Sequence, residues 1–213
     1  MHPHWISYTQ HSFVTQLGDG TLPLSVFKHY MLQDYLFLVQ FARANALAAY
    51  KSRTGPDIFT AARTILTVEH EMQMHITLCA SYGISFAELQ AAEESAACTA
   101  YTRYVLDIGQ SQDRLALEVA MASCAIGYKE IGRWLLSRET TVREGNPYWT
   151  WIQAYTSVEY VEAVGRMEEW MEVEARGVGV KRVQELVEIF TDVTRLEGRF
   201  WGSALALGKG EGE

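Results

Sequence analysis

The sequence predicts an all-α protein, and three observations support this fold class. Apolar residues recur every three to four positions over several long stretches, which is the spacing of helices that bury one face. No run shows the alternating pattern of a half-buried strand. Turn residues divide the helical stretches by short connections, which favours antiparallel neighbours. We therefore expect a helical bundle in which residues 1–213 form one domain, with a frayed tail at 208–213.

The expected helices follow one another along the chain. The first long helix covers 23–51 and ends near Gly55-Pro56, and the second covers 57–80 and ends at Gly83. Ser85 and Glu88 then have the spacing of a capping box. About seven or eight helices are expected in all, and the later ones cover 95–108, 113–137, 157–175 and 180–207, with turns at Gly109, Gly145-Asn146-Pro147 and Gly177-Val178-Gly179.

Composition limits the classes of partner. Of the 213 residues 48% are hydrophobic, which is enough to bury a substantial core. The net charge of −8 and the lack of a Lys/Arg cluster argue against nucleic acid or an anionic membrane as partner. No stretch approaches the roughly 20 apolar residues that cross a bilayer. Three cysteines without a short-spaced pair indicate reduced thiols and a cytoplasmic protein.

Cys124 lies in the segment 121–132, where small residues interrupt a strong helical pattern. The small neighbours leave room for a flat ligand beside the sulfur, and Tyr128 shares its helix face four residues later. Such a thiol is a candidate nucleophile. A lone cysteine is more often a small buried hydrophobe, so both interpretations stay open on local sequence.

Two carboxylates lie within apolar helical patterns. Asp34 is in the first long helix and Glu197 is in the last. A carboxylate in such a place is exposed, paired with a basic group or in contact with a ligand, because burial without partners costs several kcal/mol. For Glu197 an exposed ion pair with Arg195 or Arg199 is the simplest interpretation. Gly198 suggests that another surface approaches closely, because glycine costs about 1 kcal/mol in a helix.

Metal binding is disfavoured. His70 and His75 are five residues apart, which turns them about 140° from each other on a helix. Glu71 and His75 could share a face, yet the Glu-x-x-His pattern of di-iron proteins is missing. His2, His4 and His11 have no haem attachment motif beside them. We therefore expect no metal and no cofactor.

The candidate residues occur in an ordered set that resembles the TenA/thiaminase II family, in its cysteine-containing branch. The similarity extends from Trp5 to about Ala206. The set consists of Gln33-Asp34-Tyr35, Ala100-Tyr101, Cys124 with Tyr128 and Glu130-Ile131-Gly132, Trp151-Ile152 with Tyr155 and Glu159, and Glu197 with Phe200-Trp201.

The resemblance implies a haem-oxygenase-like helical fold, usually a homotetramer, without haem or metal. The implied activity is that of an aminopyrimidine aminohydrolase, which converts 4-amino-5-aminomethyl-2-methylpyrimidine to the 5-hydroxymethyl compound and ammonia. Hydrolysis of thiamin is the related activity. Similar domains are fused behind a pyrimidine kinase in some eukaryotes.

The resemblance also implies a role for each site residue. Cys124 would be the nucleophile, Asp34 would hold the ring nitrogen and the 4-amino group, and Glu197 would act as acid and then as base. Tyr155 and Tyr128 would form hydrogen bonds at the reacting end, and Tyr101 and Phe200 would supply aromatic walls. The chain departs from the family pattern at Phe37, Ser123 and Leu196, where tyrosine, proline and tyrosine are common. The loss of phenol groups bears on substrate choice.

Two other classes of function stay open. A protein that binds thiamin-related pyrimidines without turnover would show tight binding and no ammonia release. A haem-oxygenase-like metal oxidase would carry a bound metal, and the scarcity of histidine argues against this class.

Overall fold

The computed structural model describes residues 3–207, and every regular element in that part of the chain is an α-helix. The predicted fold class is therefore confirmed. The expected frayed tail at 208–213 lies outside the described residues. The helices are α1 (Pro3–Thr9), α2 (Ser12–Asp19), α3 (Leu24–Lys51), α4 (Gly55–Ser81), α5 (Phe86–Ala91), α6 (Ala96–Ser111), α7 (Arg114–Ser137), α8 (Trp149–Thr156), α9 (Val158–Glu174) and α10 (Val180–Leu207).

The long helices agree with the expected ranges, whereas three short helices were not predicted. These are α1 with 7 residues, α2 with 8 and α8 with 8. Two helical turns contain too few apolar positions to show a period, so tertiary packing rather than local pattern stabilises them. The count of seven or eight was therefore too low for the described part of the chain.

Local signals at the helix ends are confirmed. The Ser85 side chain accepts a hydrogen bond from the backbone N–H of Glu88, and the Glu88 carboxylate accepts one from the N–H of Ser85, which is a complete capping box. Gly83, Gly145 and Gly177 have φ angles of 77°, 76° and 81°, which is the left-handed region that favours glycine.

Two expectations about glycine were wrong. Gly109 is not in a turn but within α6, where a Cβ would lie 3.0 Å from Leu47 Cδ1 and 3.1 Å from Leu117 Cδ1. Its lack of a side chain therefore lets neighbouring helices approach. Gly198 shows the opposite, because no heavy atom lies within 4 Å of a Cβ built there. Within the described part of the chain, no surface therefore approaches α10 at Gly198.

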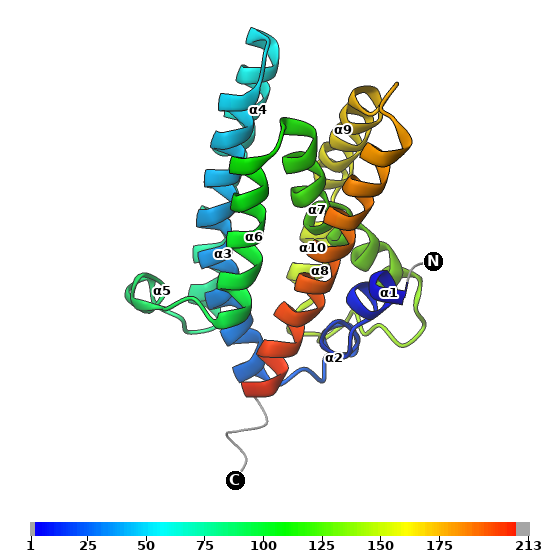
Figure 1. Cartoon of the computed structure of the whole chain (residues 1–213). Helices are drawn as coiled ribbons and strands as arrows, with labels where there is room; N and C mark the ends of the chain where they lie inside the picture. The colour runs from blue at the N-terminus through cyan, green and yellow to red at the C-terminus, as the bar shows by residue number, and fades with distance from the viewer. Residues whose placement is uncertain (1–2, 208–213) are drawn as a thin grey trace.

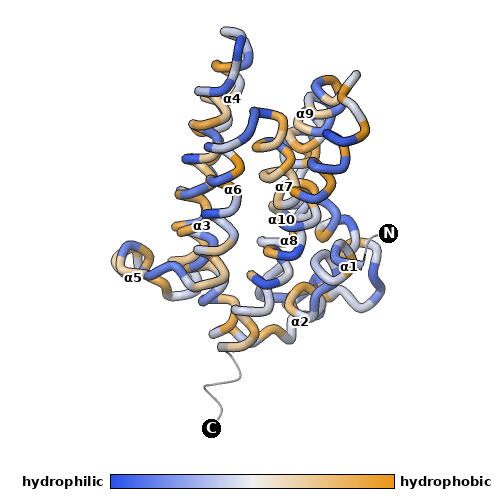
Figure 2. The backbone as a smooth tube through the Cα atoms, in the orientation of Figure 1, coloured by the Kyte–Doolittle hydropathy of each residue, from blue (hydrophilic) through white to orange (hydrophobic). Residues whose placement is uncertain are grey.

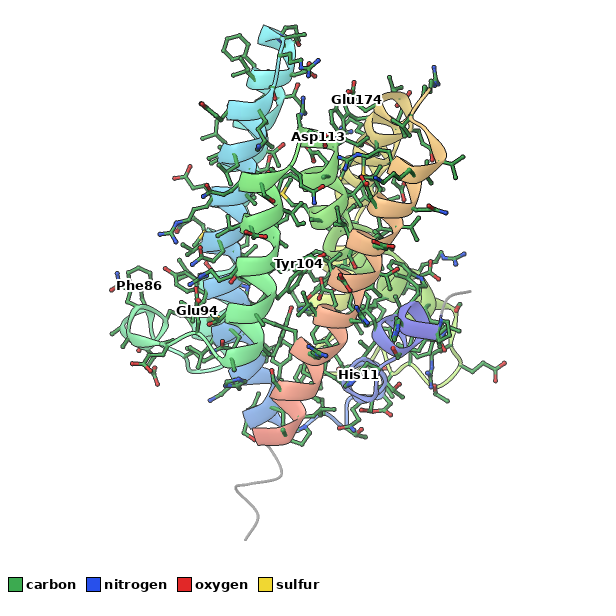
Figure 3. The ribbon with its side chains drawn as sticks, in the orientation of Figure 1. His11, Phe86, Glu94, Tyr104, Asp113 and Glu174 are labelled. Atoms are coloured by element: carbon green, nitrogen blue, oxygen red, sulfur yellow. The ribbon has the colours of Figure 1, made fainter. Side chains whose placement is uncertain are left out.

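The helices form two groups with the core between them (Figure 1). α3 packs against α4 and α6, and α7 packs against α8, α9 and α10. The groups meet where α10 contacts α6 and where α7 contacts α3. Tyr104 of α6 points toward α10 in Figure 3, and its hydroxyl donates a hydrogen bond to Asp192 at 3.1 Å. The two groups are therefore held together by polar as well as apolar contacts.

Aromatic residues fill the centre of the core. Trp201 is fully buried, and its ring lies 4.5 Å from that of Phe13 and 5.1 Å from that of Tyr30 between centroids. The Tyr30 hydroxyl accepts a hydrogen bond from the Trp151 indole at 3.1 Å and lies 3.3 Å from the Tyr128 hydroxyl. This cluster connects α2, α3, α7, α8 and α10 beneath the site described below.

One end of α4 extends past the other helices, and Figure 2 shows hydrophobic positions along it. Phe59 and Leu66 on this helix are 64% and 63% exposed. Neither these residues nor any other described part of the chain forms a helix long and apolar enough to cross a membrane.

Candidate active site

The eight candidate site residues line two adjoining compartments of one cavity between the helix groups. The first, the Glu197 compartment, is narrow because its side chains pack closely together, and the second, the Glu71 compartment, is the wider of the two. The compartments share Asp34, Phe37, Cys124 and Tyr128. The first is completed by Tyr101, Glu197 and Phe200, and the second by Leu38, Phe41, Glu71, Ala125, Tyr155 and Tyr160.

Helical spacing explains how several helices contribute to one cavity. Cys124 and Tyr128 are four residues apart on α7, so both face the same way. On α10 the same holds for Glu197 and Phe200, which are three residues apart. Tyr155 reaches Tyr128 with ring centroids 4.6 Å apart. The aromatic side chains converge, a feature that the sequence left open.

Glu197 is a buried carboxyl with one firm partner. It is 2% exposed, and the Tyr101 hydroxyl donates a hydrogen bond to its Oε1 at 2.8 Å. Burial raises the pKa of Glu197 to about 8, the charge of Asp34 adds to the rise, and the Tyr101 hydrogen bond opposes it. An exposed ion pair for this residue is therefore excluded, and Arg195 instead pairs with Asp192. Glu197 holds a proton at neutral pH.

Asp34 is also buried, at 7% exposed. Burial raises its pKa to about 7, and a hydrogen bond from Tyr30 opposes the shift. Its Oδ2 lies 3.5 Å from Nδ1 of His75 on α4, and among residues 3–207 no lysine or arginine lines either compartment. Asp34 is thus neither exposed nor paired with a basic residue of fixed charge.

Cys124 is partly exposed in the cavity. Burial raises the pKa of its thiol well above the usual value, and the charges of Glu197, Asp34 and Glu71 raise it further. The sulfur is therefore a neutral thiol at neutral pH, and a role as nucleophile would require it to lose its proton. Cys79 and Cys98 are free, fully buried and outside the cavity.

Several residues of the site were not recognised as such in the sequence. Glu71 and His75 were considered only as metal ligands, although their spacing of four already placed them on one helix face. Tyr160 lines the cavity, and its hydroxyl donates a hydrogen bond to the Ala125 carbonyl at 3.1 Å. The Tyr8 hydroxyl is buried and interacts with the charge of Glu197. Tyr8 is on α1, which is too short to show a helical period.

The described residues contain no group of three or more His, Cys, Asp or Glu side chains that could hold a metal ion. Glu71 and His75 face Asp34 of α3 across the helix interface. Burial and the charge of Asp34 raise the pKa of Glu71 to about 7, and His75 opposes this rise.

Comparisons with known proteins agree with this geometry. A provisionally named hydroxymethylpyrimidine/phosphomethylpyrimidine kinase 2 of Schizosaccharomyces pombe is 43% identical over 199 residues, which are 93% of this chain and 36% of that protein. The chain thus spans only about a third of that relative. The aminopyrimidine aminohydrolase of Halalkalibacterium halodurans is 34% identical over 204 residues, which are 95% of this chain and 90% of that protein.

Solved structures share the arrangement of the helices. A protein from a Silicibacter species, described as a TenA family transcription regulator, superposes with a TM-score of 0.88 at 38% identity and covers 96% of this chain and 92% of its own. A Shewanella denitrificans domain described as having a heme oxygenase-like fold gives a TM-score of 0.77 at 14% identity over 96% of this chain and 88% of its own, which confirms the expected fold. The sequence model of the TENA/THI-4/PQQC family matches residues 1–207, and the chain belongs to this family.

Proposed function

We propose that this chain is a thiamin salvage hydrolase that converts 4-amino-5-aminomethyl-2-methylpyrimidine and water to the 5-hydroxymethyl compound and ammonia. One observation carries the proposal. A partly exposed thiol, a buried carboxyl that holds its proton at neutral pH and a second buried carboxyl all line one aromatic cavity. These are a nucleophile, an acid and a ring-binding group for displacement at a pyrimidine methylene.

The charge of the cavity supports a cationic or amine substrate. Asp34, Glu71 and Glu197 line it, and no lysine or arginine does. An aminomethyl group is an ammonium ion in water, so it is attracted to a site lined by carboxyl groups, and it reacts as the neutral amine after it has released one proton. The relative named aminopyrimidine aminohydrolase supports the same class of substrate.

The proposed reaction begins with Cys124. Its Sγ forms a bond to a ring carbon, and the thiol proton goes to the adjacent ring nitrogen, which Asp34 binds. The 4-amino nitrogen of this adduct then donates electrons toward the methylene, whose C–N bond breaks. Glu197 gives its proton to the leaving nitrogen, which departs as ammonia.

Water completes the reaction. It adds to the methylene carbon and gives a proton to Glu197, which restores the acid. The C–S bond breaks, and the proton of the ring nitrogen returns to Sγ of Cys124. In this scheme Tyr155 and Tyr128 bind at the reacting end, and Phe37, Tyr101 and Phe200 enclose the ring. Thiamin, which carries a larger cationic leaving group on the same methylene, is the second proposed substrate.

Ammonia release from the aminomethyl pyrimidine tests the proposal. Cys124→Ser should abolish turnover and leave the fold intact, because a hydroxyl is nearly isosteric but a much weaker nucleophile. Cys98→Ser is the matched control and should retain turnover, because Cys98 is fully buried away from the cavity. Near-normal turnover by Cys124→Ser would rule out nucleophilic catalysis by this thiol. A folded wild type that binds the pyrimidine without releasing ammonia would instead be a binding protein.

A further inference from the structure

His75 lies directly behind Asp34, and the mechanism above gives it no part. The imidazole is 8% exposed and bridges α4 to α3 by two contacts. Its Nε2 is 2.7 Å from the backbone oxygen of Met31, and its Nδ1 is 3.5 Å from Oδ2 of Asp34. Both ring nitrogens are therefore directed at residues of the helix that carries the ring-binding carboxyl.

The contact with Met31 determines where the hydrogen of the imidazole lies. A backbone carbonyl only accepts, so Nε2 must be the nitrogen that donates. Burial lowers the pKa of His75, which keeps the ring neutral. Nδ1 then has a lone pair directed toward Oδ2 of Asp34.

A lone pair at Nδ1 makes the form of Asp34 important. A carboxylate oxygen at this position would face the lone pair, whereas a protonated Oδ2 would donate a hydrogen bond to it. Burial already raises the pKa of Asp34 to about 7 and so favours the protonated form. The separation of 3.5 Å is at the long end for such a bond.

We propose that His75 is a positioning residue that holds Oδ2 of Asp34 and thereby leaves Oδ1 free to accept hydrogen bonds from the 4-amino group and, once it carries the thiol proton, from the ring nitrogen of the pyrimidine. The proposal rests on the function proposed above, because it concerns the same ring. The two contacts of His75 have separate consequences. The Met31 contact orients the imidazole, and the Nδ1 contact acts on Asp34.

Two substitutions separate these contacts. His75→Asn places an amide atom near the position of Nδ1 and loses the Met31 contact, whereas His75→Gln places one near Nε2 and loses the Asp34 contact. We expect His75→Gln to weaken binding of 4-amino-5-hydroxymethyl-2-methylpyrimidine by about tenfold, measured by calorimetry, and His75→Asn to retain most of the affinity. His70→Gln is the matched control on the exposed side of α4 and should leave affinity unchanged.

Asp34→Asn provides the second comparison. If His75 acts through Asp34, His75→Gln should weaken binding much less in the Asp34→Asn background than in wild type. Equal effects in both backgrounds would overturn the proposal. It would also be overturned if the Gln and Asn variants lost affinity equally.

The pH dependence of binding gives a readout that a purely structural role would not change. Loss of the acceptor at Nδ1 destabilises protonated Asp34, so the midpoint near pH 7 should move to lower pH in His75→Gln and stay in His75→Asn. An unchanged midpoint in His75→Gln would contradict this. Both variants retain the other titratable groups that act electrostatically with Asp34: Tyr30, Glu71, Cys79, Cys98, Cys124, Tyr128, Tyr155, Tyr160 and Glu197.

The two proposals fail in different ways. A folded wild type that does not bind the pyrimidine would overturn the proposed function. Nitrogen NMR of the ligand-free protein would still test the pair, because His75 should be a neutral ring protonated at Nε2 whose Nδ1 signal changes in Asp34→Asn. A ring protonated at Nδ1, or a signal that does not change, would overturn the positioning role.

Discussion

At the scale of single residues, the site combines groups whose protonated forms are favoured by burial. Glu197 and Asp34 have pKa values raised to about 8 and about 7, and the thiol of Cys124 is neutral. An enzyme that must protonate a leaving amine near neutral pH needs an acid of this kind. Under the proposed function Glu197 supplies this acid, and it does so at the expense of stability, because the folded state disfavours the ionised carboxylates.

Glu197→Gln should therefore make the protein more stable at alkaline pH. Glu197 holds its proton up to about pH 8 in the folded protein, whereas the unfolded chain releases it near the ordinary value of 4.5. The free energy of unfolding consequently falls as pH rises through this window and changes no further above it. We expect the variant to melt about 5 °C above wild type at pH above 8, with a smaller gain at acidic pH.

Thermal unfolding followed by circular dichroism at several pH values measures this difference. Glu159→Gln at an exposed position of α9 is the control, and its effect should not depend on pH in the same way. A gain for Glu197→Gln that is equal at acidic and alkaline pH would show that the carboxyl is not protonated in the folded protein. The variant should also lose ammonia release.

At the scale of helices, the close packing of α1 against α7 depends on Gly127 of α7, which has no side chain. A Cβ at Gly127 would lie 2.2 Å from Cε1 and 2.4 Å from the hydroxyl oxygen of Tyr8. The Tyr8 ring is fully buried and also contacts Trp5 and Trp201. The ring cannot move aside without a shift of α1.

Gly127→Ala should destabilise the protein by about 1–2 kcal/mol. Overpacking of a buried ring costs roughly 1–3 kcal/mol, which exceeds the gain of about 1 kcal/mol for alanine in a helix. Gly165→Ala in α9 is the matched control, because nothing lies within 4 Å of a Cβ there, and it should be stabilising. Urea unfolding measures both, and stabilisation by Gly127→Ala equal to that of the control would show that α1 yields at little cost.

Helix-scale features differ in how far the sequence predicts them. Period and capping predict long helices such as α3 and α7, because each buries one face along its whole length. The turn assigned to Gly109 was wrong because a glycine that permits close packing looks the same in sequence as one that ends a helix. The sequence showed no helical period for α8, although this helix carries the site residue Tyr155.

At the scale of the whole molecule, the convergence of the site is a tertiary property. No local pattern shows that Asp34, Cys124 and Glu197 meet, and their ordered resemblance to a family was what predicted one site. Neither a local pattern nor the family resemblance predicted the contacts between α4 and α3, such as that of His75 with Asp34. The single domain, the cytoplasmic location and the tetramer stay predictions.

The tetramer can be tested on the exposed apolar residues of α4. The family resemblance implies an assembly of four copies. Phe59 and Leu66 are exposed apolar side chains that contact with another copy would bury. We expect light scattering to give four times the mass of one chain, and Phe59→Glu combined with Leu66→Glu to lower it. Lys181→Glu, at an exposed polar residue of α10, is the control and should leave the mass unchanged. A monomeric wild type would contradict the tetramer.

A single residue joins α8 and α9, and each of these helices contributes a tyrosine to the cavity. Ser157 ends α8 and also caps α9, where its hydroxyl oxygen accepts a hydrogen bond from the N–H of Tyr160 at 3.2 Å. Tyr155 and Tyr160 lie on either side of this joint, with ring centroids 5.1 Å apart. Tyr155 and Tyr160 both line the Glu71 compartment beside Cys124, so a rotation of the backbone at Ser157 would displace one wall of that compartment relative to the other.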